Sequence, residues 1–338
     1  MFVWDDNWLA SHVEEVIEPE LPIVDPHHHL WEREGMSTYL LPDLHADTGA
    51  GHNVEATVFM ECGWGYRTTG RERLRPVGET ETVAADACAS RVALRADGKP
   101  AAVIKGIVGF ADLMLGDAVD EVLDAHEAVG EGLFRGIRHA TAFDPDPGIR
   151  RTHTRPTPQI MAEPAFRAGV RRLVARGHSF DAWLYHPQIT EYAALARAVP
   201  EGTLVLDHLG GLLGVGPYKG MRTDILEKWR SDLAELASCP NVNLKVGGIG
   251  MVIFGLGFEH QTVAPSSEDL VAAWGGPIRY AIEQFGVERC MFESNFPVDK
   301  MSCSYVTLWN AFKRIASDAS ASEKAALFHD TATRVYRL

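Results

Sequence analysis

The run Asp25-Pro26-His27-His28-His29 carries residue types and a spacing that suit metal binding. It directly follows the apolar pair Ile23-Val24, which indicates a short buried strand. Residues i and i+2 of a strand point to the same face, so His27 and His29 should aim their imidazoles at one point beyond the strand's carboxyl end. Neutral imidazole is the commonest metal ligand in proteins. The alternative is that these histidines cap the strand or hydrogen-bond a loop.

Polar side chains also follow four later apolar runs. The segments are Tyr185-His186-Pro187, Asp207-His208-Leu209-Gly210-Gly211, the single residue Lys245, and Glu293-Ser294-Asn295-Phe296-Pro297. A lone histidine at a strand end is more often structural than a ligand. Whether these groups form one site depends on whether their strands end at the same place.

Eight apolar runs of strand length alternate with amphipathic helical stretches. The expected strands are 23–25, 56–61, 103–110, 134–138, 180–185, 203–206, 242–246 and 290–293. This alternation indicates βαβ units and a parallel sheet, and eight units in one domain predict an α/β fold of the (β/α)8 TIM-barrel type. A doubly wound open sheet is the alternative, but no Gly-x-Gly-x-x-Gly follows a strand to support it.

In such a barrel the carboxyl ends of all strands meet at one mouth. The four histidines at the ends of strands one, five and six would therefore converge on a shared site; they are His27, His29, His186 and His208. Long segments after strands should build the pocket on the same face; they are 63–82, 142–163, 209–223 and 247–276. The apolar stretch 247–258 is either a lid, a subunit contact or a loop folded onto the barrel.

The chain is expected to divide into an N-terminal arm, residues 1–20, and a barrel domain, residues 21–338. The arm reads as an extra helix whose Trp4 and Trp8 pack on the barrel or on a partner subunit. Ser320-Ala321-Ser322-Glu323 reads as a capping box that opens a last helix, expected to close the barrel from outside.

Composition narrows the class of protein. A net charge of −14 argues against nucleic acid or an anionic membrane as partner. No apolar run reaches the roughly 18 residues of a spanning helix, and the first residues lack the features of a signal peptide. The five cysteines lack Cys-x-x-Cys spacing and suit reduced thiols in a cytosol. We therefore expect a cytoplasmic enzyme acting on a small molecule, and we also expect a homo-oligomer.

Several further groups at the strand ends are expected to contact substrate. Arg138 ends strand four, where a guanidinium can bind a substrate carboxylate through two hydrogen bonds, although a structural ion pair is as good an explanation. Aromatic residues near strands one and two can stack on a flat ring. The expected substrate-binding residues are Trp31, Glu61, Trp64, Arg138, His139, Tyr185 and Lys245.

Four motifs together resemble the amidohydrolase superfamily, in the branch called amidohydrolase family 2, over nearly the whole chain. They are Asp-x-His-x-His-Leu-Trp from Asp25, Arg-Gly-Ile-Arg-His from Arg135, Asp-His-Leu-Gly-Gly from Asp207, and Met-Phe-Glu-Ser-Asn-Phe-Pro-Val from Met291. Within that branch the chain is most similar to sugar-lactone and pyrone-dicarboxylate lactonases. The resemblance implies a TIM-barrel hydrolase that holds one or two divalent cations.

The same resemblance implies roles for individual positions. His27 and His29 match the ligand pair of strand one, His186 the histidine of strand five and His208 that of strand six. The family has an aspartate after strand eight that takes the proton of the hydrolytic water. Asn295 stands at that position here.

Asn295 changes the expected chemistry because an amide cannot accept a proton at any useful pH and adds no negative charge to a metal site. The base must then be another group: Glu293, Asp299, or a histidine freed from ligation, His208 or His186. Zinc held by histidines with an open water position remains feasible. The resemblance also includes lactonases that work without a cation, so a metal-free mechanism is the alternative.

We expect a hydrolase that opens a lactone or a related cyclic ester or amide, with His208, Glu293 and Asn295 at the reacting atoms. The expected cofactor is a divalent cation, zinc, held by the barrel-mouth histidines. The substrate is a small molecule, and it is expected to carry a carboxylate. The rival interpretations are a metal-dependent decarboxylase of an aromatic or enoic acid, and a barrel that binds a ligand without catalysis.

Overall fold

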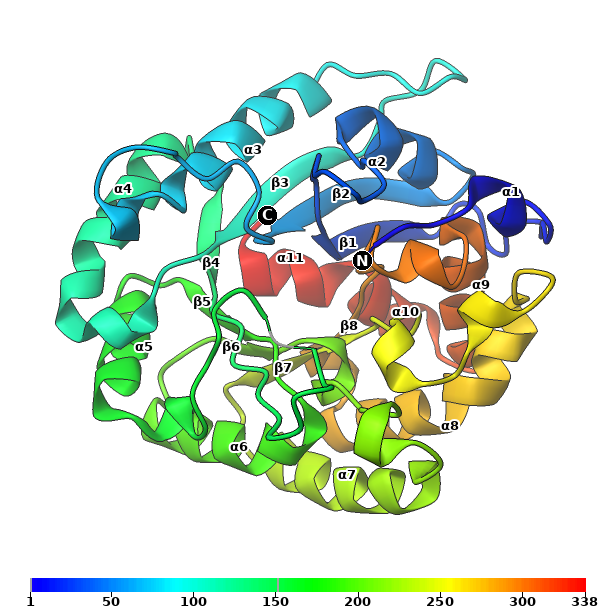
Figure 1. Cartoon of the computed structure of the whole chain (residues 1–338). Helices are drawn as coiled ribbons and strands as arrows, with labels where there is room; N and C mark the ends of the chain where they lie inside the picture. Colours follow the sequence, from blue (N-terminus) through cyan, green and yellow to red (C-terminus); the bar gives the residue numbers. More distant parts are fainter. Residues whose placement is uncertain (1, 151) are drawn as a thin grey trace.

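The computed structural model describes residues 2–150 and 152–338, and eight parallel strands run around a barrel in chain order, β1 to β8 (Figure 1). Their bounds are β1 Pro22–His28, β2 Asn53–Met60, β3 Val103–Gly109, β4 Phe134–Arg138, β5 Ser179–Ala182, β6 Leu204–Leu206, β7 Val242–Val246 and β8 Cys290–Phe292. All eight predicted strands are confirmed, and so is the (β/α)8 class. Strand five is shorter than expected, since it ends at Ala182.

Hydrogen bonds from the residues after β8 close the barrel against β1. The N–H of Asn295 donates to the carbonyl of His27 at 2.9 Å, and the N–H of His29 donates to the carbonyl of Phe296 at 2.7 Å. The buried Asp25 carboxylate joins the same two strands, because it accepts from the backbone N–H of Ser294 at 3.0 Å. The first and last strands are therefore fixed together at the level of the histidine pair.

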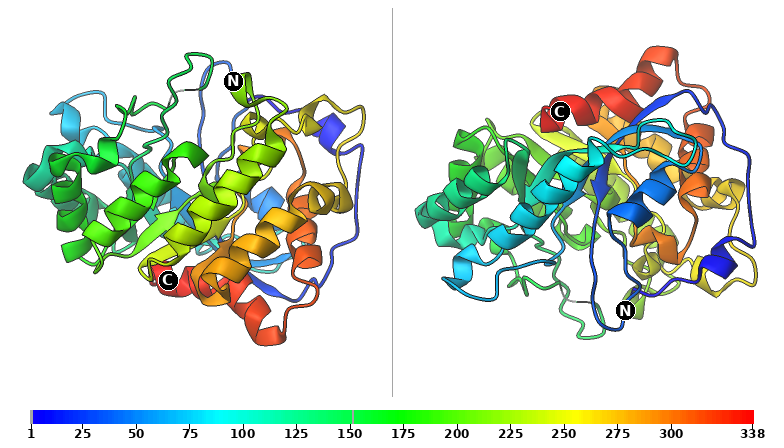
Figure 2. Two further views of the ribbon diagram at one scale, coloured as in Figure 1. Left: turned by 90° about the horizontal axis from the view of Figure 1, so that it is seen from below. Right: turned by 90° about the horizontal axis from the view of Figure 1, so that it is seen from above.

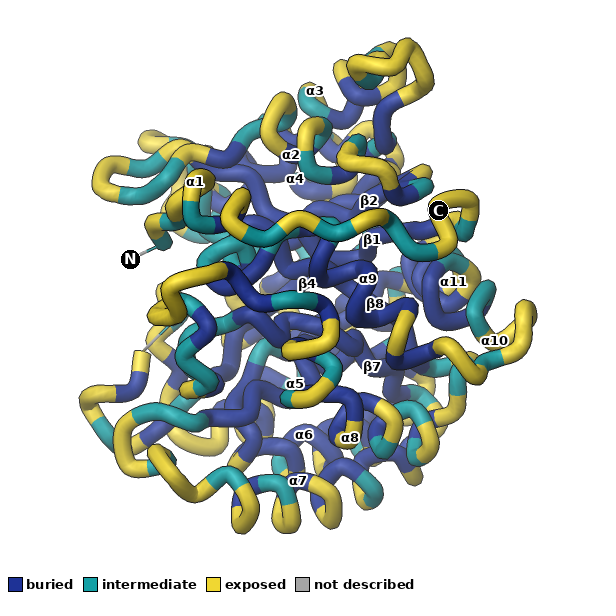
Figure 3. Tube along the Cα trace, turned by 90° about the vertical axis from the view of Figure 1, so that its right-hand side faces the viewer, coloured by how far each residue is buried: buried dark blue, intermediate teal, exposed yellow. Residues whose placement is uncertain are grey.

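Helices surround the strands, and the strands form the buried interior (Figures 2 and 3). The helices are α1 Asp6–Leu9, α2 Leu41–Thr48, α3 Val77–Ser90, α4 Asp120–Val129, α5 Pro164–Ala175, α6 Ile189–Ala198, α7 Arg222–Ala237, α8 Ser267–Phe285, α9 Tyr305–Ile315, α10 Ala321–Ala325 and α11 Thr331–Tyr336. Two predicted loops are shorter than expected, because α3 and α8 begin inside segments 63–82 and 247–276. None of the helices described is both long and apolar enough to cross a membrane.

The C-terminal helices lie outside the strands and pack across one end of the barrel (Figure 2). The predicted capping box is confirmed, since Ser320 and Glu323 cap α10 reciprocally. A π-helical turn, Ala326–Asp330, connects α10 to α11. The side chains of Val335 and Tyr336 then join Val24, Val58 and the other apolar residues of the barrel interior. The expectation that this helix closes the barrel from outside is confirmed, because its apolar face packs against the interior residues at one end of the strands.

The N-terminal arm is mostly irregular, so the expectation of a helix along it is wrong outside α1. This four-residue helix is capped by the Asp5 carboxylate. Trp4 packs edge-on against Tyr39, and the Nε1 of Trp8 donates to the carbonyl of Gln261 at 2.8 Å. Of the two expected alternatives, packing on the barrel is confirmed for Trp4, whereas Trp8 makes a hydrogen bond to the loop that precedes α8.

Candidate active site

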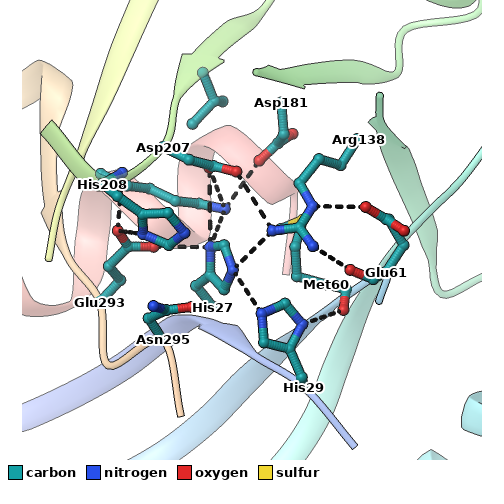
Figure 4. Close-up of polar contacts among 12 residues, drawn as sticks. His27, His29, Met60, Glu61, Arg138, Asp181, Asp207, His208, Glu293 and Asn295 are labelled. Carbon is teal, nitrogen blue, oxygen red and sulfur yellow. Dashed lines mark hydrogen bonds and ion pairs between the residues drawn. The ribbon is translucent and has the colours of Figure 1, made fainter. Parts of the chain in front are cut away.

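His27 and His29 face each other at the carboxyl end of β1 (Figure 4). Their Nε2 atoms are 3.2 Å apart. The Nδ1 of His29 lies 2.7 Å from the carbonyl oxygen of Met60, and because a carbonyl only accepts, that nitrogen carries the ring proton. The Nε2 of His29 therefore presents a lone pair to His27. His28, between them, points the other way and contacts Thr57.

The two nitrogens of His27 also have distinct partners. Its Nε2 lies 3.2 Å from an Nη of Arg138, and because a guanidinium only donates, this nitrogen keeps a lone pair. Its Nδ1 lies 2.8 Å from Oε2 of Glu293 and 3.3 Å from the ammonium of Lys245. Burial, with the charge of Lys245 adding to it, lowers the pKa of His27 well below its usual value. Burial therefore favours the neutral form of this imidazole.

His208 and Glu293 form a second pair beside His27. The Nδ1 of His208 lies 2.7 Å from Oε1 of Glu293, which also accepts the backbone N–H of His208 at 3.2 Å. The ring of His208 packs against Trp183, with the centroids 5.0 Å apart. Gly248, at a φ of +65°, permits this placement, because a Cβ there would lie 2.6 Å from the imidazole. With Nδ1 committed to the carboxylate, Nε2 of His208 is the nitrogen left for other partners.

Buried carboxylates outnumber the buried cations around these histidines. Asp181 and Asp207 lie 2.9 and 3.2 Å from the Lys245 ammonium, and Glu61 lies 2.9 Å from the Nε of Arg138. Together with Glu293 they make four carboxylates against the cations of Arg138 and Lys245. Burial raises the pKa of Glu293 to about 8 and also raises that of Asp207, although Lys245 opposes both shifts. The cluster would therefore be stabilised by a further positive charge, either protons or a metal ion.

The donor set fits a divalent cation. Two nitrogens bound to one tetrahedral zinc at about 2.0–2.1 Å would lie about 3.3 Å apart, close to the 3.2 Å between the Nε2 lone pairs of His27 and His29. His27, His208 and Glu293 also offer ligand atoms that lie within 4.8 Å of one another. The Oε2 of Glu293 and both carboxylate oxygens of Asp207 are buried and, among the described residues, have only ion-pair contacts, to His27, Lys245 and Arg138, and no well-aligned hydrogen bond. A metal ion here would compete with Arg138 for the lone pair on His27.

Asn295 lies at the edge of this cluster in a left-handed backbone conformation, with a φ of +54°. Its Nδ2 donates to Oδ1 of Asp299 at 2.8 Å, which leaves its carbonyl oxygen free while the residue lines the cavity. The other oxygen of Asp299 accepts from the N–H of Gly250 at 2.7 Å. Asp299 is fully buried and is not among the cavity residues, so it is poorly placed to act as a base.

A cavity of about 170 Å³ opens beside the histidines. Its walls include His29, His208 and Asn295 from the strand ends and the apolar residues 251–253 from the loop after β7. The predicted loop at 247–258 therefore folds onto the barrel mouth, where its Phe254 and Phe258 are buried.

Only part of the expected substrate-binding set reaches this cavity. Trp31, Glu61, Arg138 and Tyr185 line it, whereas Trp64, His139 and Lys245 do not. Lys245 is fully buried beneath the histidines, and the Nδ1 of His139 accepts from the N–H of Leu113. Arg138 is committed to Glu61 and His27, so its guanidinium is held within the wall.

The expectation that His186 joins the other three histidines is not supported by its position. Its Nδ1 accepts from the N–H of Leu213 at 3.3 Å, and its ring packs against Tyr218. Because β5 ends at Ala182, the first residue beyond the strand is Trp183, and this side chain lines the cavity. Burial lowers the pKa of His186 to about 4, so it is a neutral structural imidazole.

Other residues of the site were not predicted from the sequence. Asp181 was not named, and Asp207 was named only within the strand-end run that contains His208, without a role of its own. Phe2, Arg33 and Arg150 also line the cavity, but they come from the arm and from loops, where no strand alternation predicts a direction.

Barrel and cluster together define a TIM-barrel enzyme with a histidine–carboxylate centre at the carboxyl ends of its strands. The family profile described as amidohydrolase matches residues 24–338. The chain belongs to this amidohydrolase family and is a hydrolase.

Similar proteins agree with this assignment. An uncharacterised protein, y4mH, of Sinorhizobium fredii is 34% identical over 340 residues, covering 94% of this chain and 99% of that protein. An L-fucono-1,5-lactonase of Burkholderia multivorans is 28% identical over 237 residues, covering 70% and 72% of the two chains. The crystal structure of a Burkholderia multivorans amidohydrolase with bound zinc has a TM-score of 0.70 at 24% identity, covering 94% and 99%.

Proposed function

We propose that this hydrolase opens a lactone, or a related cyclic ester or amide, by adding water to the ring carbonyl. The observation that carries the proposal is the joint placement of His29, His208 and Asn295 on one small cavity, with Glu293 directly behind His208. The similarity to L-fucono-1,5-lactonases favours a lactone as the cyclic substrate.

His208 is the group best placed to move the proton. Its Nε2 can accept a proton from a water in the cavity, while Glu293 holds the Nδ1 proton and stabilises the imidazolium that forms. Water oxygen then bonds to the carbonyl carbon, and the ring carbon–oxygen bond breaks. The imidazolium returns its proton to the departing alkoxide, and the product is an open-chain hydroxy acid.

Asn295 and Arg138 would assist this reaction, by orienting the attacking water and by placing positive charge near the substrate. The side-chain carbonyl of Asn295 can orient the attacking water, because its amide nitrogen is fixed to Asp299. Arg138, held by Glu61, places positive charge next to His27 and the wall of the cavity. A divalent cation, which we propose to be zinc, would be held by the facing Nε2 atoms of His27 and His29, and would polarise the carbonyl or lower the pKa of water. A neighbour in fold contains zinc, which supports this choice.

The experiment is a panel of five- and six-membered lactones, including sugar lactones, followed by acid release at constant pH. Purification without chelator and elemental analysis accompany it. Hydrolysis that disappears in His208→Ala, but not in the exposed-residue variant His260→Ala, supports the proposal. Release of CO₂ from aromatic or enoic acids, with no lactone opened, would instead identify a decarboxylase and overturn it.

A further inference from the structure

We propose that Arg33 and Arg150 form an anion-binding subsite in the outer wall of the cavity, and that Phe2 of the N-terminal arm positions Arg150 within it. The substrate would then be an anionic molecule, one that carries a carboxylate or a group of similar shape and charge. The role of this subsite in binding a substrate rests on the function proposed above, but the anion-binding subsite itself does not.

The first argument is the absence of acidic partners. Arg33 and Arg150 both line the cavity, and in the described parts of the chain no carboxylate lies within 4.0 Å of either guanidinium. The third arginine of the cavity, Arg138, is paired with Glu61 at 2.9 Å. An Nη of Arg33 donates to the carbonyl of Cys62 at 2.6 Å. Partial burial lowers the pKa of Arg150, and the nearby charge of Arg33 adds to this effect.

Two guanidiniums without an acidic partner share one cavity, in a chain with a net charge of −14. Acidic residues are plentiful, and nine of the described arginines have one within 4.0 Å, as Arg67 does with Glu81. A guanidinium presents a planar fork of donors that matches a carboxylate, and two such forks facing one cavity suit an anion. The positive charge is thus kept available where a small molecule would bind.

The second argument is the aromatic support of both guanidiniums. Arg33 lies over the ring of Trp31, with 5.9 Å from Cζ to the ring centroid, and Arg150 lies 4.4 Å over the ring of Phe2. The rings of Phe2 and Trp31 stack on each other at 5.4 Å. The faces of these rings stabilise both cations without neutralising them.

The arm is tied to the barrel at this point, which makes Phe2 a positioning residue. Its carbonyl accepts from the N–H of Ser37 at 3.0 Å, and the N–H of Trp4 donates to the Ser37 hydroxyl at 3.3 Å. Ser37 in turn accepts the Nε1 proton of Trp31 through its carbonyl, at 2.8 Å. One short loop therefore fixes both rings that support the arginines.

The test uses isophthalate, a flat ring with two carboxylates, and its neutral analogue isophthalamide. Isothermal titration of the metal-loaded protein should show that isophthalate binds, that added salt weakens its binding, and that isophthalamide binds far more weakly. Arg33→Gln and Arg150→Gln should each weaken isophthalate binding about 10- to 100-fold, the usual range for a lost charge-assisted contact. Arg230→Gln is the matched control, because Arg230 is exposed on α7 and lies over Tyr280 in the same way.

Phe2 needs its own pair of variants. Phe2→Ala should weaken isophthalate binding about threefold, the scale of one lost cation–π contact, and Phe2→Tyr should restore it because the ring is retained. A structural role alone would lower the melting temperature without this selective loss for the anion over isophthalamide.

Equal binding of isophthalate and isophthalamide, or no binding of isophthalate in the millimolar range, would overturn the subsite, as would unchanged affinity in both arginine variants. Failure of the proposed function has a different signature. If no lactone is hydrolysed but isophthalate binding depends on Arg33 and Arg150, the subsite stands and the lactonase does not. If lactones are hydrolysed but anionic and neutral ones react equally in wild type and in both variants, the subsite is wrong.

Discussion

The Nδ1 of His208 lies 2.7 Å from Oε1 of Glu293, and the same oxygen accepts the backbone N–H of His208 at 3.2 Å. One carboxylate therefore fixes both the position and the tautomer of this imidazole. Glu293 itself is fully buried and is not a cavity residue, whereas His208 lines the cavity. This arrangement supports our proposal that the histidine is the proton acceptor and the glutamate its support, two candidates that the sequence could not rank.

Glu293→Gln tests that division of roles. The amide keeps the shape of the side chain but cannot stabilise an imidazolium, so lactone turnover should fall about 10²- to 10⁴-fold, the contribution usual for general base catalysis. Glu283→Gln, at an exposed position of α8, is the control for a glutamate removed elsewhere. Initial rates and melting temperatures are measured together. A Glu293→Gln enzyme that is folded and turns over within a few-fold of wild type would exclude the His208–Glu293 mechanism.

Two of the histidines predicted as ligands, His29 and His186, should differ when metal content is measured. His29→Ala removes one of two facing Nε2 lone pairs, so it should reduce bound metal from about one equivalent to traces and abolish turnover. His186→Ala should retain both metal and most of the turnover, because its imidazole contacts Leu213 and Tyr218 instead. Elemental analysis after dialysis checks both variants.

The opposite results would change either the set of metal ligands or the mechanism. Loss of metal in His186→Ala, with the protein still folded, would place that residue among the ligands and require a different arrangement of the loop after β5. Full turnover of a metal-free wild-type protein would establish the metal-free mechanism, in which the same histidines polarise the carbonyl.

Asn295 and Asp299 should behave as a coupled pair. Asn295→Asp would set two buried carboxyl groups at hydrogen-bond distance, where burial already raises the pKa of Asp299 well above its usual value. The free energy of unfolding should therefore fall by about 1–3 kcal/mol near neutral pH. Combining Asn295→Asp with Asp299→Asn restores one donor facing one acceptor and should recover most of that loss.

Urea denaturation of the two single variants and the double variant measures this coupling. Additive losses of unfolding free energy in the double variant would show that the two side chains do not interact.

Asn295→Ala should lower turnover by the equivalent of about 1–3 kcal/mol, since one polar contact to water or substrate is removed.

The fold was predictable because each barrel strand is buried and reads as a short apolar run between turn signals. The structure of the N-terminal arm was not predictable. The spacing of Trp4 and Trp8 is typical of the apolar face of a helix, but the two side chains contact the rest of the chain separately. The last helix closes the barrel from outside as expected, although its apolar face alone does not reveal which end of the barrel it covers.

The site was predictable where strand alternation fixes direction. Strand alternation correctly predicted that His27 and His29 share one face and that Glu293 directly follows β8. It did not determine His186, which lies four residues past the end of β5, where a 3₁₀ turn sets the side-chain direction. Lys245 lies inside β7 rather than beyond it, so its ammonium meets Asp181 within the barrel.

His126 gives a prediction about acid stability that is independent of catalysis. This fully buried imidazole on α4 donates from Nε2 to the carbonyl of Phe110 at 2.9 Å, and its Nδ1 lies 2.8 Å from the Thr80 hydroxyl. Burial lowers its pKa from 6.5 to about 4. Between these two pH values the unfolded chain binds a proton that the folded protein does not, so folding stability falls as the pH is lowered from 6.5 to 4.

The loss attributable to His126 over that interval is about 3 kcal/mol, from the 1.36 kcal/mol carried by each unit of pKa. His126→Gln keeps a donor and an acceptor without a titrating group. It should lower stability at pH 7, where the stacking of His126 on Phe134 is lost, but flatten the dependence on pH below 6.5 by up to one proton. His260→Gln, at an exposed position, should leave the slope unchanged. Unfolding free energies from urea titrations at several pH values give these slopes, and identical slopes for wild type and His126→Gln would show that His126 does not titrate on unfolding.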